Sequence, residues 1–173
     1  MQIYWMSVPD QGLFTIRVIE ASYEHVPKVT FYAMDITSAM LKIISRKSDK
    51  IIPILGLAEN ITKSIEYASK FIEVPKKFDA IFSILTLHHC LSVERVFESI
   101  KNALKSSGKA VIVDLCEHPF DEFREEIGDI YLGFNLSFIK EMAEKFFSSV
   151  HIERMPGIQC ECSGRSAELF IDT

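Results

Sequence analysis

The chain has no long apolar run, no surplus of positive charge and very little glycine near its start. Its longest apolar stretches, 51–58 and 80–87, have the length of strands, well short of the ~20 residues that a membrane-spanning helix needs. The net charge is −5 and no basic stripe is present, whereas neutralising nucleic-acid phosphates needs clustered Lys and Arg. We therefore expect neither a membrane nor a nucleic acid as partner.

Cysteine is also scarce. Cys90, Cys116, Cys160 and Cys162 are unevenly spaced, which is not a disulfide framework in a chain of this length. The first ten residues carry neither a basic leader nor a long apolar stretch, so no signal peptide is expected. We expect reduced thiols and a cytoplasmic protein. The oligomeric state leaves no signal in the sequence.

What the chain does contain is an alternation of short β-like runs with longer helical periods. The pattern predicts strands at 29–35, 50–56, 78–85, 109–115, 150–155 and 167–171, and helices at 38–47, 62–72, 93–105 and 137–147. Ser92 and Ser137 are expected to cap the last two helices. Such alternation predicts right-handed βαβ crossovers and a parallel sheet with helices on both faces.

The last two expected strands are separated only by 156–165, a Gly-containing segment too short for a helical crossover. They should therefore pair as an antiparallel hairpin. The predicted fold is a single α/β domain over residues 1–173, a Rossmann-like three-layer sandwich with a mostly parallel sheet and a C-terminal antiparallel hairpin.

In open α/β sheets, ligands bind outside the carboxyl ends of the strands. Asp35 stands at such an end, and its carboxylate can accept two hydrogen bonds from a ribose diol. The alternative is that Asp35 merely caps the helix that follows. Two further strand ends carry the sequences Gly-Leu-Ala-Glu-Asn at 56–60 and Ser-Ile-Leu-Thr-Leu-His-His at 83–89.

These segments resemble the motifs of class I S-adenosylmethionine-dependent methyltransferases, over most of the chain from Gly12 onward. The segment 34–41 is similar to the family's second motif, which implies that Asp35 holds the ribose and that Ile36 packs on adenine. The family's Gly-Asp-Ala-Glu stretch matches 56–59, but Leu57 replaces the Asp. Adenine recognition would then depend on backbone near Ala58.

Glu59 either contacts the ligand or is a solvated loop residue. The segment 77–90 resembles the family's fourth-strand signature, which ends in Leu-His-His. The resemblance places Ser83 by the methionine end of the cofactor and His88 and His89 at the floor of the acceptor pocket. A histidine there acts as a general base or orients the acceptor; the alternative for each is packing within the loop.

The segment 96–114 resembles the helix, turn and fifth strand of the family, with Ser-Ser-Gly replacing Pro-Gly-Gly at 106–108. The sequences at 114–118 and 128–134 resemble methyltransferases found behind a winged-helix DNA-binding domain, a part that this chain lacks. Asp114 and His118 would either face the acceptor or form a pair that holds a loop.

Cys160, Cys162 and His151 invite a metal interpretation, but the spacing does not fit a zinc knuckle. We expect no metal.

The family's first motif, a strand ending in Asp followed by Gly-x-Gly-x-Gly, is missing. In its place, 4–12 contains a single glycine, Gly12, although glycines are needed there for the backbone to approach the cofactor. The chain as written should therefore bind the cofactor weakly. Gly12 would be all that is left of this loop.

Reverse translation suggests an explanation. If the codons of 4–12 are read two bases later, the first three shifted codons give Leu-Asp-Val, given a TCN codon at Ser7. The remainder gives Gly-x-Gly-x-Gly if the codons of Ser7, Pro9 and Gln11 end in G. The restored loop would end 23 residues before Asp35, near the ~20 residues expected between such a loop and the ribose acid. We hypothesise a frameshift near Gly12.

The first functional interpretation is methyl transfer from S-adenosylmethionine to a small-molecule acceptor, which the motifs do not identify. The second is an impaired methyltransferase-like binding or regulatory domain. A nicotinamide dehydrogenase fits the acidic residue after the second strand but not the expected final hairpin. An N-terminal lid segment lost together with the first motif stays an open alternative.

Overall fold

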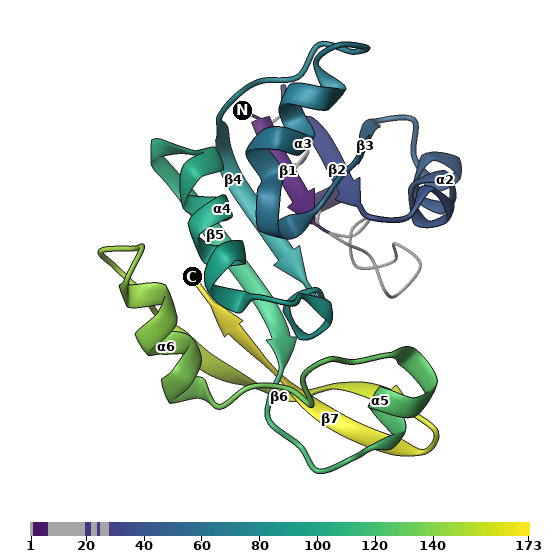
Figure 1. The fold of residues 1–173 in the computed structure, drawn as a ribbon, viewed down its shortest axis with the longest axis vertical. Coiled ribbons are helices and arrows are strands. Elements are labelled where there is room, and N and C mark those ends of the chain that lie inside the picture. The colour runs from purple at the N-terminus through teal and green to yellow at the C-terminus, as the bar shows by residue number, and fades with distance from the viewer. Residues whose placement is uncertain (1, 7–19, 22–23, 25–27) are drawn as a thin grey trace.

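The computed structural model describes residues 2–6, 20–21, 24 and 28–173. In these residues the chain forms a seven-stranded sheet of order β3-β2-β1-β4-β5-β7-β6 (Figure 1). The strands are β1 (Gln2–Met6), β2 (Thr30–Asp35), β3 (Ile51–Leu55), β4 (Phe78–Ile84), β5 (Leu104–Leu115), β6 (Ile152–Cys162) and β7 (Arg165–Asp172). The helices are α2 (Ser38–Lys47), α3 (Ile61–Ala68), α4 (Val93–Ala103), α5 (Glu122–Ile127) and α6 (Leu136–Glu144), with 3-10 turns at Ala58–Asn60 and Leu87–His89.

The strand directions confirm the expected fold class. Strand β1 lies between β2 and β4 and is parallel to both, and β2–β3 and β4–β5 are also parallel pairs. Strand β7 is antiparallel to both of its neighbours, β5 and β6. Strand β1 is therefore the middle one of the five strands that run parallel to one another. None of the helices in the described parts of the chain has the length and apolarity to span a membrane.

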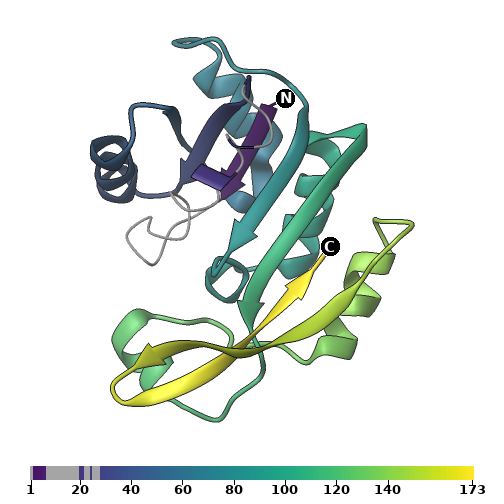
Figure 2. The same cartoon turned by 180° about the vertical axis from the view of Figure 1, so that it is seen from behind.

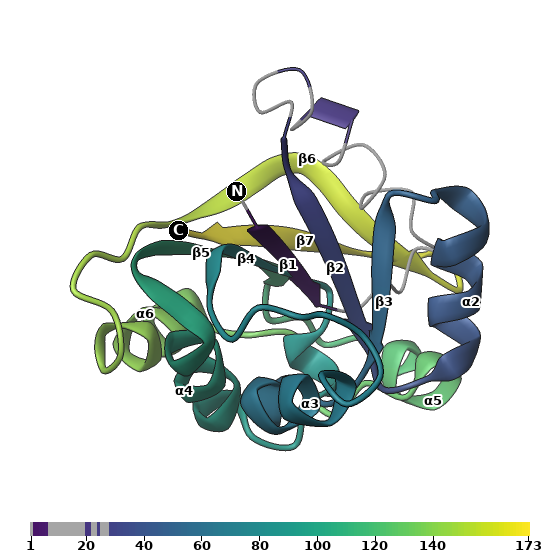
Figure 3. The same cartoon turned by 90° about the horizontal axis from the view of Figure 1, so that it is seen from above.

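Alternating side chains of the strands divide the core into two clusters. Tyr32 and Met34 belong to the cluster that includes buried residues of α3, α4 and α6, and Figure 3 shows these helices on one side of the sheet. Phe31 and Ala33 belong to the second cluster, which includes buried residues of α2 and α5. Period-two alternation thus gives the sheet two apolar faces, each covered by helices.

Of the two expected N-cap residues, one is confirmed and one is not. Ser92 caps α4, because its hydroxyl accepts a hydrogen bond from the Arg95 N–H at 3.4 Å. The prediction for Ser137 was wrong: the cap of α6 is Asn135, whose Oδ1 accepts from the backbone N–H of Ser137 at 2.9 Å. An Asn side chain two residues upstream reaches the free N–H groups of the first turn.

Two boundaries differ from the expected ones for reasons of packing. Helix α4 ends at Ala103 because the chain enters β5 at once, so Gly108 lies within a strand and not past a helix end. It faces a register irregularity of β4, where a Cβ atom on Gly108 would lie 2.9 Å from the carbonyl oxygen of Phe78. Close approach of two backbones therefore requires glycine there.

The antiparallel hairpin is confirmed, but its connection is shorter than expected. Strand β6 continues through most of 156–165 and turns at Ser163 and Gly164. Its register shifts between Met155 and Gln159, and Gly157 within this bulge has a φ of 78°. Pro and Gly thus mark a bulge and not a loop. Figures 1 and 2 show the long hairpin extending beyond the parallel strands, with α5 beside its tip.

Candidate functional site

A cavity of about 440 Å³ opens where β2, β3 and β4 end. Its polar side chains include Asp35, Glu59 and His89, and its walls include the aliphatic side chains of Ile36 and Leu57. Both the size and the mixture of apolar walls with a few polar groups are typical of small-molecule sites. The position agrees with the rule that ligands bind at the carboxyl edge of a parallel sheet.

Asp35 is buried at the carboxyl end of β2, with 7% of its surface exposed. Its Oδ1 accepts hydrogen bonds from the backbone N–H of Thr37 at 2.7 Å and from the Thr37 hydroxyl at 2.8 Å. Asp35 does not cap α2, because the N-cap position is Thr37. One carboxylate oxygen thus shapes the loop, and no hydrogen bond to the other, Oδ2, is seen among the described residues.

Gly56 closes the base of the cavity. Its N–H donates to the Asp35 carbonyl at 3.0 Å, so the ends of β2 and β3 are fastened together. A Cβ atom at this position would lie 2.5 Å from the Met34 sulfur and 2.5 Å from the Ser64 side chain. The expected motif at 56–59 therefore has a steric reason for its glycine.

Glu59 is more than a solvated loop residue. It lines the cavity, and its Oε1 accepts a hydrogen bond from the backbone N–H of Leu91 at 3.0 Å. This bond ties the turn after β3 to the loop after β4. Ala58 lines the same wall.

Large aliphatic side chains are unusually exposed around this cavity. Ile36 is 66% exposed, Leu57 is 46% exposed and Leu91 is 80% exposed. Gathered exposed apolar surface of this kind marks ligand-binding grooves. The three side chains provide an apolar surface on which a planar base can pack.

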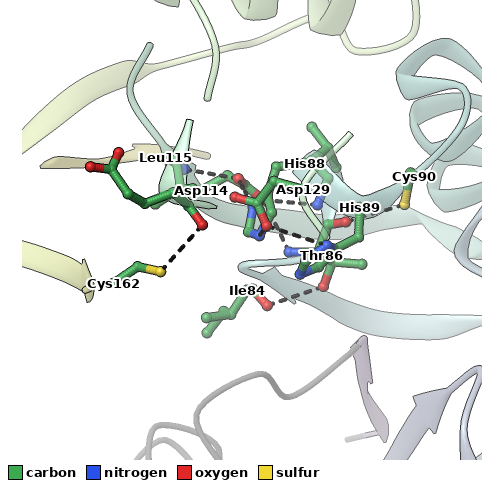
Figure 4. A network of polar contacts seen from close by, with 11 residues as sticks. Ile84, Thr86, His88, His89, Cys90, Asp114, Leu115, Asp129 and Cys162 are labelled. Carbon is green, nitrogen blue, oxygen red and sulfur yellow. Dashed lines mark hydrogen bonds and ion pairs between the residues drawn. The ribbon is translucent and has the colours of Figure 1, made fainter. Parts of the chain in front are cut away.

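Asp114, at the end of β5, is the centre of a buried network (Figure 4). Its Oδ2 accepts from the backbone N–H groups of Thr86 at 3.0 Å and Leu87 at 2.8 Å. Its Oδ1 accepts from the Leu115 N–H at 2.8 Å and lies 2.6 Å from His88 Nδ1. With no surface exposed, Asp114 holds the loop after β4 and does not face an acceptor.

The loop held by Asp114 begins with a strained residue. Leu85 has a φ of 48°, which is uncommon for a residue with a side chain. This bend turns the chain from β4 into the Leu87–His89 turn. Backbone strain of this type persists only where the surroundings fix it, and here the Asp114 carboxylate supplies that restraint.

His88 and His89 lie differently despite being neighbours. His88 is 3% exposed and is held by Asp114, whereas the side chain of His89 is 35% exposed and lines the cavity. Burial opposes protonation of His88, but Asp114 and Asp129 together raise its pKa above the ordinary value. Burial, followed by repulsion from His88, lowers the pKa of His89. The neutral form of His89 is therefore favoured at the cavity.

The structure adds a residue that the sequence analysis did not select. Asp129 is 2% exposed and its Oδ1 lies 3.7 Å from His88 Nε2 and 3.6 Å from His89 Nδ1. Neither of its carboxylate oxygens has a hydrogen-bond partner among the described residues. Burial raises the pKa of Asp129 above its usual range. Thr86, Cys90 and Leu91 also line the cavity without having been selected; only their place after β4 pointed to them.

Two expected site residues lie away from the cavity. Ser83 is fully buried in β4, in register with Met6 of β1 and Ile112 of β5, and its hydroxyl has no partner within the described ranges. His118 is 9% exposed, and its ring packs against Phe120 and Phe123. Neither residue lines the cavity. The sequence had led us to expect Ser83 beside the methionine end of the cofactor and His118 either facing the acceptor or paired with Asp114.

Gly12 and the remainder of 7–12 lie outside the described residues, so the expected loop defect stays a prediction. The cysteine pair and His151 do not come together: His151 bonds to Thr173 at one end of the hairpin, and Cys162 contacts Glu122 at the other. All four cysteines are free, which agrees with the expectation of reduced thiols.

A family model described as "Methyltransferase domain" matches residues 10–112. The matched segment runs through the end of β2, the cavity wall and most of β5. The chain belongs to this methyltransferase family, whose cofactor is S-adenosylmethionine. The comparison with curated proteins gives no match.

Solved methyltransferase structures share the fold. A phosphoethanolamine N-methyltransferase 2 of Haemonchus contortus, in complex with phosphomonomethylethanolamine and S-adenosylhomocysteine, is 20% identical with a TM-score of 0.64, over 90% of this chain and 35% of that chain. The DszA carbon methyltransferase is 16% identical with a TM-score of 0.69, over 99% of this chain and 46% of that chain. The present chain thus spans about a third to a half of the length of these structures.

Proposed function

We propose that the chain transfers a methyl group from S-adenosylmethionine to a small-molecule acceptor. One observation supports this most directly: the buried carboxylate of Asp35 borders a cavity at the carboxyl ends of β2, β3 and β4. The fold that presents this cavity is similar to that of solved methyltransferase structures.

The residues present fit the adenosine part of this cofactor. Asp35 Oδ2 is placed to accept from the ribose hydroxyls, while Oδ1 is fixed by Thr37. Ile36 and Leu57 offer the apolar surface for adenine. Because Gly56 has no side chain, Met34 and Ser64 can pack closely against its backbone at the base of the cavity.

Few catalytic side chains are needed for this reaction. The cofactor supplies an electrophilic methyl group when it is bound, and the protein mainly holds the nucleophile in line. Of the four residues that the sequence analysis selected as catalytic candidates, His89 is the one that lines the cavity. His88 and Asp114 act through the loop that carries His89, since they fix its backbone.

The cavity that is assigned to adenosine also borders His89, and its charge favours a neutral or cationic acceptor beside that residue. Its charged lining groups are the carboxyl groups of Asp35 and Glu59, and among the described residues no Lys or Arg lines it. A phosphorylated acceptor would need Arg or Lys donors. The Haemonchus enzyme binds a phosphorylated amine, so the two chains are proposed to differ in acceptor charge.

The second candidate function is a binding or regulatory domain without turnover. It is favoured by the sequence at 4–12, where one glycine stands in place of three. The free cysteines and the net charge of −5 support a cytoplasmic protein that acts without nucleic acid under either proposal.

Titration with S-adenosylhomocysteine, followed by amide chemical shifts, tests the site even if the affinity is only millimolar. We expect the largest shifts at Ile36, Leu57 and His89. Asp35→Asn should abolish them, and Asp49→Asn, at an exposed turn before β3, should leave them intact. Shifts confined to other surfaces would refute the proposed site. Release of S-adenosylhomocysteine from S-adenosylmethionine with neutral and amine acceptors then separates the enzyme from the non-catalytic domain.

A further inference from the structure

Asp129 is a buried carboxylate that makes no hydrogen bond within the described part of the chain. Both of its oxygens are buried, and burying a carboxylate in that condition is unfavourable. Its distances of 3.7 Å and 3.6 Å to the two histidine nitrogens are too long for hydrogen bonds. A group of this kind calls for an ion or a water that completes its bonding.

Three ligand atoms converge at this point. His88, His89 and Asp129 each offer one nitrogen or oxygen atom, and the three atoms all lie within 4.8 Å of one another. Ligand atoms on a tetrahedral zinc ion, with bonds of about 2.1 Å, are separated by about 3.4 Å. The two distances to Asp129 are close to that value, and the third separation is at most 4.8 Å.

The backbone brings the carboxylate to the histidines in a fixed way. The N–H groups of Ile130 and Tyr131 donate to the carbonyl of His88 at 2.9 Å and 3.1 Å. Just before them, Gly128 ends α5 with a φ of 79°, a conformation that glycine adopts without strain. The loop after α5 is thus fastened to the very residue that Asp129 approaches.

The surroundings of His88 are those of a metal ligand. Its Nδ1 is paired with the Asp114 carboxylate at 2.6 Å, and Nε2 is the nitrogen that faces Asp129. Metal-binding histidines usually donate their other ring N–H to a carboxylate, which fixes the ring and raises its basicity. Asp114 in turn is held by three backbone N–H groups.

We propose that His88 Nε2, His89 Nδ1 and Asp129 bind a divalent first-row transition ion such as Zn²⁺. Two imidazoles and one carboxylate match the ligand preference of these ions and leave at least one coordination position for another ligand. Because His89 also lines the cavity, the open position lies beside it. That an acceptor oxygen or amine occupies this position rests on the proposed function; the ion site itself does not. The proposal departs from the sequence expectation of no metal, since residues 40 positions apart form the site.

Co²⁺ titration of the full, metal-stripped chain tests the site without any cofactor. We expect one equivalent of Co²⁺ to produce visible d–d bands, which Zn²⁺ then displaces. His89→Gln should weaken binding at least tenfold, and Asp129→Asn should do the same while keeping the shape of the buried group. His151→Gln, at an exposed histidine far along the hairpin, and Cys160→Ser should bind like the parent chain.

Circular dichroism melts show whether each variant is folded; His89→Gln carries little risk because its side chain is partly exposed. Absence of stoichiometric Co²⁺ and Zn²⁺ binding by the folded parent chain would overturn the proposal, as would parent-like binding by folded His89→Gln. S-adenosylhomocysteine titration of the same samples distinguishes failure of the metal site from failure of the proposed cofactor site. Variants that lose metal binding should still show the chemical-shift changes at Ile36 and Leu57.

Discussion

The Asp114 carboxylate lies 2.6 Å from His88 Nδ1 while accepting hydrogen bonds from the backbone N–H groups of Thr86, in the loop after β4, and of Leu115, at the end of β5. This pair joins the end of β5 to the end of β4. The sequence left open an acceptor-facing carboxylate or a loop-holding pair of Asp114 with His118. The structure instead pairs Asp114 with His88, and the carboxylate holds the loop after β4.

Asp114→Asn should destabilise the fold by about 3 kcal/mol. The amide keeps one oxygen and replaces the other by an NH₂ group, which cannot accept a hydrogen bond. Either the N–H groups of Thr86 and Leu87 or those of Leu115 and His88 therefore lose their acceptor, and leaving buried donors unsatisfied costs about 1–3 kcal/mol or more. Urea unfolding measures the loss. Asp121→Asn, at a 73% exposed side chain, is the control; equal stability of the two variants would contradict the role given to Asp114.

Gly56→Ala should reduce both stability and cofactor binding. A methyl group here overlaps the Met34 sulfur and the Ser64 side chain, and overpacking of this kind costs about 1–3 kcal/mol. Because Gly56 also bonds to the Asp35 carbonyl, the shift would move the carboxylate that we propose to bind the ribose. Thermal melting and S-adenosylhomocysteine titration check the two effects. An unchanged melting temperature would show that the base of the cavity is looser than described.

Asp172 should make the fold less stable as the pH rises from about 4 to 6. Burial, opposed by His151, raises its pKa from 3.8 to about 6, so the folded state binds the proton more tightly than the unfolded state in that window. Asp172→Asn removes this penalty. The variant should match the parent near pH 4 and exceed it by about 1–3 kcal/mol at pH 7, as measured by urea unfolding at both pH values. A difference that does not vary with pH would contradict the assignment.

The frameshift hypothesis is tested by the gene itself. The codons of Ser7, Pro9 and Gln11 should each end in G, because only these give glycine in the shifted frame. A codon with another third base at any of the three positions excludes the restored motif. Sequencing of the genomic segment that encodes residues 1–15 is the measurement.

Most of the fold could be predicted because its signals are local. The apolar strand of β4 and the period of α2 specify their elements within a few residues, and the shortness of 156–165 specifies an antiparallel pair. The cap at Asn135 and the bulge at Gly157 were missed because Ser137 and the Pro-Gly pair fit two local structures equally well, and tertiary packing chooses between them.

The candidate site was predictable only in part. Asp35 and Gly56 stand at strand ends, which the order of elements reveals. Asp129 was not selected, because its proximity to His88 depends on a six-residue helix without a clear period and on the backbone bonds from Ile130 and Tyr131 to His88, which are distant in the sequence. His89 is partly exposed and His88 is buried because Asp114 holds His88. No periodic pattern in the sequence indicates that Asp114 lies beside these histidines.

Calorimetric titration with S-adenosylhomocysteine tests the central claim most directly, with four chains in one series. The chain as written and a chain whose residues 5–12 are replaced by Leu-Asp-Val-Gly-x-Gly-x-Gly are each compared with their Asp35→Asn versions. We predict millimolar or undetectable affinity as written, micromolar affinity with the restored loop, and at least a tenfold loss on Asp35→Asn in that background. Restored binding that does not depend on Asp35 would contradict the site, and micromolar binding by the chain as written would contradict the defective loop.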